Sequence, residues 1–545
     1  MKGRQILTLI TLVVFSACNR KERADLVLFN ARVYTVDSAF RMAEAIAVKN
    51  GKIIAVGANN EIEARYFSDS ALDAGGRAVF PGFIDAHAHF LAYAQKLFTA
   101  DLYNSRDFDE VLERLKAFSL ANPDEPWILG SGWDQNKWPG KTFPTNERLN
   151  QLFPDKPVFI SRVDGHAAIV NQKAIEIAKI SNGQKIDGGI IETRAGKLTG
   201  LLIDNATGLV SHNIPEPSTK DLEKRLLAAQ QNCFAMGLTT ITDCGLNFQD
   251  IDLIDSLQKT GKLLMRLYIL LSDNKQNIDH YLGRGPYKTE KLFVNGFKVY
   301  ADGALGSRGA CLLAPYTDKP GWSGFLLNPA SHYDSMASLL VRTRFQICTH
   351  AIGDSGNRVV LKAYTRALNG KNDRRWRIEH AQTIDPEDFG LFGRSSIIPS
   401  VQPTHATSDM YWAAERLGEK RIKYAYAYKK LLQENGWIAL GTDFPVEDIS
   451  PFKTFLAAVF RKDAKGYPDG GFQIENGLSR EETLRGMTIW AARADFLEQE
   501  LGSLEKGKKA DFILLDKDLF EASAAEILQI HVLATYSGGI KVYSR

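Results

Sequence analysis

The chain has 545 residues, of which 44% are hydrophobic and 24% are charged. A chain of this length exceeds one ordinary globular core, so the composition predicts a large folded domain with an accessory module. The formal net charge of +3 is small and the sequence contains no basic patch, which argues against a nucleic-acid partner.

The first residues resemble a bacterial lipoprotein signal. Lys2 and Arg4 precede an apolar run over residues 6–15, which is too short to span a bilayer, and Ser16-Ala17-Cys18 follows. We expect a signal peptide over 1–17, lipidation of Cys18 and a polar tether over 18–24. The protein would then be exported and held on the periplasmic side of the bacterial cell envelope, with its N-terminal lipid as the sole membrane contact. A signal peptide cleaved without lipidation is the alternative.

Four further cysteines lie in the body of the chain: Cys233, Cys244, Cys311 and Cys348. They are too few for a disulfide framework in a chain this long, so we expect core thiols. Cys348 lies two residues before His350, and a role as an additional metal ligand is its alternative.

Short strands with turn signals fill residues 25–79. They are expected at residues 26–29, 31–36, 45–48 and 53–56, with Asn50-Gly51 as a tight hairpin turn between the last two. Residues 511–515 and 540–543 show the same pattern. Because short strands cannot bury their faces alone, we expect segments 25–79 and 501–545 to form one small β-sandwich.

Between these ends, apolar strand candidates alternate with helix-like stretches. The candidates are residues 78–84, 239–242, 267–271, 297–300, 345–349, 376–378, 397–401 and 438–440. Strands that alternate with helices in this number predict an α/β fold, a closed (β/α)8 TIM barrel over residues 80–500, with a doubly wound open sheet as the alternative. The count requires a large insertion over about residues 90–236, which contains the strand candidate 158–163 and a helix from Asp221 to Met236.

Two histidines follow the first of these strands, with one residue between them. Side chains alternate across a strand, so His87 and His89 project from the same face and can reach one cation. Neutral imidazole is a good ligand for zinc and related divalent metals. Two polar residues at a strand end are the alternative.

Later strands also end in polar side chains. Lys298 lies on the fourth strand, His350 on the fifth, His380 on the sixth and Asp443 just after the eighth. Catalytic residues of barrels collect at the carboxyl ends of the strands. Each histidine alone is compatible with a hydrogen-bonded core position, whereas their joint placement predicts a metal site.

These motifs resemble the metal-dependent amidohydrolase superfamily and, within it, the amidohydrolase 3 group of YtcJ-like proteins and N-substituted formamide deformylases. The resemblance covers residues 25–545. It rests on Pro81–His89, Asp164-Gly165-His166, Lys298–Ala310, His350–Asp354, Glu379-His380-Ala381, Gly441–Pro445 and Gly502–Phe512.

The resemblance implies one or two divalent metal ions, with zinc as the expected metal. The implied ligands are His87, His89, Lys298, His350, His380 and Asp443. Lys298 would bridge two metals as N6-carboxylysine, because an ammonium group has no lone pair to donate. The alternative is an unmodified Lys298 that pairs with Asp302 or Asp443 beside a single metal.

The resemblance also implies hydrolysis of a non-peptide carbon–nitrogen bond in a small amide, an N-acyl amine or an N-formyl amine. Metal-bound hydroxide would attack the carbonyl, and Asp443 would act as general acid/base. His166 is expected to be catalytic and substrate-binding, by polarising the carbonyl or binding the oxyanion. Asp302 and Arg308 are expected to bind substrate, Arg308 through a carboxylate. A purely structural role is the alternative for His166 and Arg308.

Two other functions stay open. A deaminase of this superfamily generally has a glutamate just after the fifth-strand histidine, and Ala351-Ile352-Gly353-Asp354 contains none. A lipoprotein that binds a small ligand without turnover would lack metal ligands, yet every expected position is filled. The substrate and the assembly state, for which a homo-oligomer is open, are not predicted.

Overall fold

Eight parallel strands, arranged in chain order, form the barrel of the central sheet, and the short strand β19 (Tyr287–Lys288) pairs antiparallel with one of them. The computed structural model describes residues 21–545, so the predicted signal peptide and Cys18 lie outside the described residues. The strands are β10 (Phe83–Ala88), β17 (Leu238–Leu246), β18 (Arg266–Ser272), β20 (Leu292–Tyr300), β21 (Gln346–Ala351), β22 (Arg377–His380), β23 (Ile398–Val401) and β24 (Ala439–Leu440).

Each of these eight strands pairs in parallel with the next. The sheet closes because β24 contacts β10. Just beyond, the backbone N–H of Asp443 donates to the carbonyl of His87 over 2.8 Å. The predicted (β/α)8 barrel is therefore confirmed, and the open doubly wound sheet is excluded.

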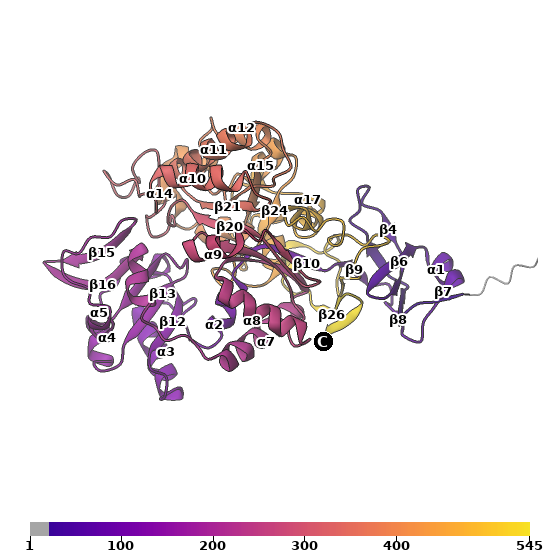
Figure 1. Cartoon of the computed structure of the whole chain (residues 1–545), viewed down its shortest axis with the longest axis horizontal. Coiled ribbons are helices and arrows are strands. Elements are labelled where there is room, and N and C mark those ends of the chain that lie inside the picture. The colour runs from indigo at the N-terminus through magenta and orange to yellow at the C-terminus, as the bar shows by residue number, and fades with distance from the viewer. Residues whose placement is uncertain (1–20) are drawn as a thin grey trace, which may run out of the picture.

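Helices connect the barrel strands and cover the outside of the sheet (Figure 1). They include α8 (Phe248–Lys259), α9 (Lys275–Tyr281), α10 (Ala330–Leu340), α11 (Asp354–Leu368), α12 (Phe389–Arg394), α13 (Pro403–Asp409), α15 (Tyr428–Asn435), α16 (Pro451–Phe460), α17 (Arg480–Gly486) and α18 (Ile489–Ala494).

The helix expected from Asp221 to Met236 is α7 (Thr219–Ala235). It begins where the Ser218 side chain accepts from the Asp221 N–H at 3.2 Å, and it ends before Gly237, whose φ of +80° favours glycine. Its apolar face is buried in the core of the barrel. The helix therefore belongs to the barrel, although the predicted insertion range includes it.

The insertion after the first barrel strand forms its own six-stranded sheet, at the left in Figure 1. The strand order is β11 (Ala100–Asp101), β12 (Ile128–Trp133), β13 (Val158–Arg162), β14 (Ala167–Val170), β16 (Lys197–Asp204) and β15 (Gly189–Arg194). Helix α3 (Phe108–Ala121) packs on this sheet through Val111, Leu112 and Leu115. The strand predicted at residues 158–163 thus lies outside the barrel.

Both chain ends build the sandwich, at the right in Figure 1. One sheet contains β6 (Lys52–Gly57), β5 (Ala45–Lys49), β2 (Leu26–Phe29) and β8 (Ala71–Asp73), and the other contains β27 (Ile540–Ser544), β26 (Val532–Ser537), β25 (Phe512–Leu515), β9 (Ala78–Pro81), β3 (Arg32–Tyr34) and β4 (Met42–Ala43). Their shared core includes Leu28 and Val79 from one end and Phe512 and Tyr536 from the other. This confirms the predicted β-sandwich.

The apolar run at residues 78–84, expected to be one strand, is two strands in two sheets. Strand β9 pairs with β3 and β25 in the sandwich, and β10 pairs with β17 in the barrel. The chain passes from one sheet to the other at Gly82, where a Cβ would collide with the side chain of Thr239. Among residues 21–545, no helix combines the length and the apolar character that a membrane span requires.

Candidate metal centre

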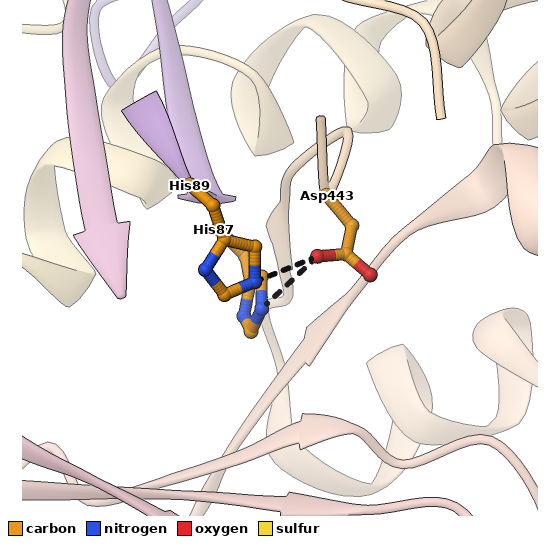
Figure 2. A group of neighbouring side chains, drawn as sticks. All are labelled: His87, His89 and Asp443. Atoms are coloured by element: carbon orange, nitrogen blue, oxygen red, sulfur yellow. Dashed lines mark ion pairs between the residues drawn. The ribbon is translucent and has the colours of Figure 1, made fainter. Parts of the chain in front are cut away.

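His87 and His89 present the same ring nitrogen to Asp443 (Figure 2). Nε2 lies 3.5 Å from Asp443 Oδ1 in His87 and 3.2 Å from it in His89. Both Nδ1 atoms have other partners, since His87 Nδ1 donates to Glu379 Oε2 over 2.5 Å and His89 Nδ1 to the Cys244 carbonyl over 2.9 Å. A partner at Nδ1 fixes the tautomer and leaves the Nε2 lone pair free for a metal ion.

Asp443 follows β24, and the residue before it, Thr442, is hydrogen-bonded to Asp85 of the first barrel strand. Asp85 Oδ1 accepts from the Thr442 N–H at 3.0 Å, and Asp85 Oδ2 accepts from the Thr442 hydroxyl at 2.7 Å. Asp443 has a φ of +63°, a left-handed conformation that non-glycine residues adopt rarely and mainly at functional sites. Burial raises the pKa of its carboxyl, but the surrounding histidines outweigh burial and lower this pKa well below its ordinary value.

His350 and His380 complete the floor of the site. Their ring centroids lie 4.5 Å apart, and the His380 ring lies 4.8 Å from that of His87. Burial lowers the pKa of both rings well below the ordinary value, so both are neutral at pH 7. His350 Nε2 and His380 Nδ1 are buried without a hydrogen-bond partner among the described residues.

The structure adds His405, a residue that the sequence analysis did not select. It lies on α13, and its Nε2 is 3.2 Å from Asp443 Oδ2. Burial lowers the pKa of His405, but the Asp443 carboxylate outweighs burial and raises this pKa to about 9. The available signal was its position four residues beyond the seventh barrel strand, at the same end of the barrel as the other candidates.

These residues form two groups that share Asp443. His87, His89 and Asp443 form one group, and His380, His405 and Asp443 form the other, with the ligand atoms of each group within 4.8 Å of one another. Buried imidazole nitrogens without partners, facing a carboxylate, are the donors that zinc and similar divalent metals prefer. The residues present therefore fit one or two such ions.

Lys298 lies in the same cluster. Its side chain is fully buried on β20, and Nζ is 3.0 Å from His87 Nε2. The alternative of an unmodified lysine expects an ion pair between Lys298 and Asp302 or Asp443. Among the described residues, the ion pairs of these two aspartates are with histidines and not with Lys298.

One cavity of about 1110 Å³ opens over this cluster. The barrel contributes metal-site residues to its lining, and the insertion contributes Leu129, Phe159, Arg162 and His166. A small-molecule site commonly measures about 300–1,000 Å³, so the cavity holds a small molecule with room for a sizeable substituent. The insertion thereby forms a wall of the site.

A profile of the amidohydrolase family Amidohydro_3 matches residues 70–543 of the chain. The chain belongs to this amidohydrolase family.

Three relatives of this amidohydrolase align over nearly its whole length. The protein LONG AFTER FAR-RED 3 of Arabidopsis thaliana is 32% identical, covering 95% of this chain and 92% of its own. The amidohydrolase YtcJ of Bacillus subtilis is 30% identical, covering 94% of this chain and 98% of its own. The N-substituted formamide deformylase of Arthrobacter pascens is 26% identical, covering 96% and 98%.

A solved structure supports the same assignment. The crystal structure of a metal-dependent hydrolase from Pyrococcus horikoshii superimposes on the amidohydrolase with a TM-score of 0.74 and 26% sequence identity, covering 92% of this chain and 99% of the other. The predicted membership of the amidohydrolase 3 group is confirmed.

Two residues predicted to bind substrate do not line the cavity. Asp302 is fully buried, and its carboxylate accepts from the backbone N–H groups of Cys311, Ile352 and Gly353 at 2.8–3.0 Å. Arg308 pairs with Asp318 at 2.8 Å. Asp302 thus braces the loops around the site, and Arg308 braces the glycine-rich loop, residues 303–310. Substrate binding by either residue stays a prediction.

The remaining candidates have clear positions. His166 lines the cavity, with its ring 5.0 Å from that of His350. Cys348 is buried in an apolar cluster with Cys244, and its Sγ donates to Gln346 Oε1 at 3.3 Å, as expected of a core thiol. Cys233 is also buried, whereas Cys311 is only partly buried, and the four cysteines within residues 21–545 are all free.

Proposed function

We propose that this amidohydrolase is a metal-dependent enzyme that hydrolyses a non-peptide carbon–nitrogen bond in an amide, an N-acyl amine or an N-formyl amine. The observation that carries the proposal is the convergence of two histidine Nε2 atoms on Asp443 Oδ1 at 3.2 and 3.5 Å, on the floor of a cavity of about 1110 Å³. The cavity is large enough for an acyl group together with its amine.

The metal would be held by His87, His89, His350, His380 and Asp443, with His405 as an additional ligand of a second ion. A bound divalent cation, for which we propose zinc, supplies Lewis-acid polarisation of the carbonyl and lowers the pKa of water to about 7. Lys298, as N6-carboxylysine, would supply carboxylate oxygens as further metal ligands.

The chain supplies the proton transfers. The Asp443 carboxylate takes a proton from water and delivers it to the departing nitrogen, without which an amine is a poor leaving group. His166, on the insertion side of the cavity, would donate a hydrogen bond to the carbonyl oxygen as negative charge develops there. The apolar side chains of Leu129 and Phe159 would hold the substituent and reduce access of bulk water.

One sequence feature favours amide hydrolysis over deamination. The residue that follows His350 is Ala351, not glutamate, and the nearby Asp354 accepts from the Leu313 N–H at 2.8 Å instead of facing the cavity. The site therefore lacks the carboxylate that the deaminase alternative requires there. The filled ligand positions likewise disfavour a lipoprotein that binds a ligand without turnover.

For location, we propose export and lipid anchoring through Cys18. This proposal is supported by the N-terminal motif alone. Metabolic labelling with a fatty-acid analogue, with Cys18→Ser as control, tests it: loss of label from the variant supports the proposal, and label in neither protein contradicts it.

The function is tested with purified, zinc-loaded protein and a panel of N-acylated amines and amino acids, N-formyl amines, hydantoins and lactams. We expect bound metal by elemental analysis and release of amine from part of the panel. Asp443→Asn should retain much of the metal and lose hydrolysis by about 10²–10⁴-fold. Metal-free protein after growth in metal-replete medium would favour the ligand-binding alternative.

A further inference from the structure

Asp204 adopts a backbone conformation that ordinarily requires glycine. It ends β16 of the insertion with φ +51° and ψ −126°. An aspartate in this region is strained, and such strain persists where surrounding structure holds it for a function. The strained backbone therefore indicates that the carboxylate of Asp204 has a function that glycine could not supply.

The side chain of Asp204 has one polar partner. Its Oδ1 accepts from His166 Nδ1 over 2.7 Å, and its backbone N–H donates to the His166 carbonyl over 2.9 Å. The carboxylate is fully buried, and Oδ2 has no hydrogen-bond partner among the described residues. Asp302 and Asp354, by contrast, accept from backbone N–H groups and so hold the loops that contain them. Asp204 thus serves His166 rather than the backbone.

The glycine-rich loop, residues 303–310, encloses this carboxylate. A Cβ at Gly303 would lie 2.5 Å from both carboxylate oxygens of Asp204, and a Cβ at Gly309 would collide with Oδ2. Gly309 does not have a left-handed φ, so its lack of a side chain is needed for space rather than for backbone geometry. Two segments about 100 residues apart in sequence therefore meet around one carboxylate.

We propose that Asp204 is the positioning residue of His166, and that the glycine-rich loop holds its carboxylate in place. By accepting from Nδ1, Asp204 fixes the ring orientation and leaves Nε2 for the substrate, next to His350. To donate from Nε2 to the substrate carbonyl, the ring must carry a proton on both nitrogens, a form that the adjacent Asp204 carboxylate favours. The role of His166 toward substrate rests on the proposed function, whereas its contact with Asp204 does not.

The first test compares Asp204→Ala and Asp204→Asn, using the panel substrate that the wild type hydrolyses best. We expect Asp204→Ala to lower kcat about 10–100-fold with KM, zinc content and thermal stability little changed. Asp204→Asn keeps an acceptor for Nδ1 and should restore part of that loss. Asp354→Asn, another buried carboxylate outside the cavity, is the control and should keep wild-type kcat. Wild-type kcat in Asp204→Ala would overturn the proposal.

The second test couples the loop to the carboxylate. Gly309→Ala should lower kcat in the wild-type background, because the new Cβ displaces the carboxylate. In an Asp204→Ala background the colliding atom is gone, so Gly309→Ala should cause no further loss. Equal losses in both backgrounds would show that the loop acts independently of Asp204, contrary to the proposal.

A third measurement does not depend on hydrolysis. In the full-length protein with ¹⁵N-labelled histidine, the Nδ1 proton of His166 should give a low-field resonance that disappears in both His166→Ala and Asp204→Ala. If this holds while the wild type hydrolyses no amide, the proposed function fails and the Asp204–His166 contact stands. Retention of the resonance in Asp204→Ala would overturn the positioning proposal whatever the substrate.

Discussion

Glu379 accepts a hydrogen bond from His87 Nδ1 over 2.5 Å and so joins the sixth barrel strand to the first. Burial raises the pKa of Glu379, but His87, Arg377 and Lys298 outweigh burial and lower it to about 2. An ionised Glu379 requires a proton on His87 Nδ1, so the lone pair on His87 Nε2 faces Asp443. Such carboxylate–histidine pairs raise the basicity of a metal ligand.

Glu379→Gln should weaken zinc binding about 10–100-fold, because a neutral amide supports the required tautomer of His87 less strongly. Competition with a chromogenic chelator measures this affinity. Glu387→Gln, which changes an exposed glutamate outside the cavity, is the control. Unchanged zinc affinity in Glu379→Gln would mean that the barrel alone orients His87.

His405→Ala should also weaken zinc binding about 10–100-fold and lower turnover, because it removes a donor from the second ligand group. Elemental analysis at limiting and saturating zinc would show whether one ion per chain is lost first. The control is His332→Ala. His332 lies outside the cavity, and its Nε2 is 2.8 Å from Asp273 Oδ2. Normal zinc content and turnover in His405→Ala would limit His405 to support of Asp443.

Lys298→Ala should lower activity by at least about 100-fold, and a short carboxylic acid such as acetate should restore part of it by supplying the missing oxygens. Lys298→Met fills the space and should resist this rescue. Electron density at Lys298 in crystals grown with bicarbonate tests the carbamate directly. An unmodified amine in that density, without rescue by any acid, would contradict the carbamate.

Lys96 gives a prediction for pH. Its Nζ lies 3.6 Å from the Tyr103 ring centroid, and burial lowers the pKa of Lys96 from 10.5 to about 8. Between these pH values the unfolded chain binds more protons here than the folded one, so this lysine increases the free energy of unfolding as pH rises through the window.

The free energy of unfolding of the wild type minus that of Lys96→Met should therefore grow between pH 7 and 9.5. We expect a change of about 1 kcal/mol after a discount for partial exposure. Urea titrations across this range measure the difference, and Lys137→Met controls for a new methionine at the cavity. A constant difference would contradict the lowered pKa of Lys96.

Most of the barrel and of its candidate metal ligands was predictable because both depend on local pattern. Short apolar runs followed by polar residues mark strand ends, and parallel strands of a closed barrel bring those ends together. His87, His89, His350, His380 and Asp443 were identified in this way. The split at Gly82 was missed because two consecutive strands without an intervening turn read as one apolar run.

The sequence by itself determined the family, the strand count and the principal candidate ligands. Each motif and each strand is recognised from a short run of residues that are close neighbours along the chain. Only the tertiary structure decided the partners: Glu379 for His87, His405 for Asp443, Asp204 for His166, and backbone amides for Asp302. The physical reason is that a hydrogen-bond partner is determined by proximity in space, and closure of the barrel brings together side chains as far apart in sequence as Asp85 and Thr442, which are separated by 357 residues.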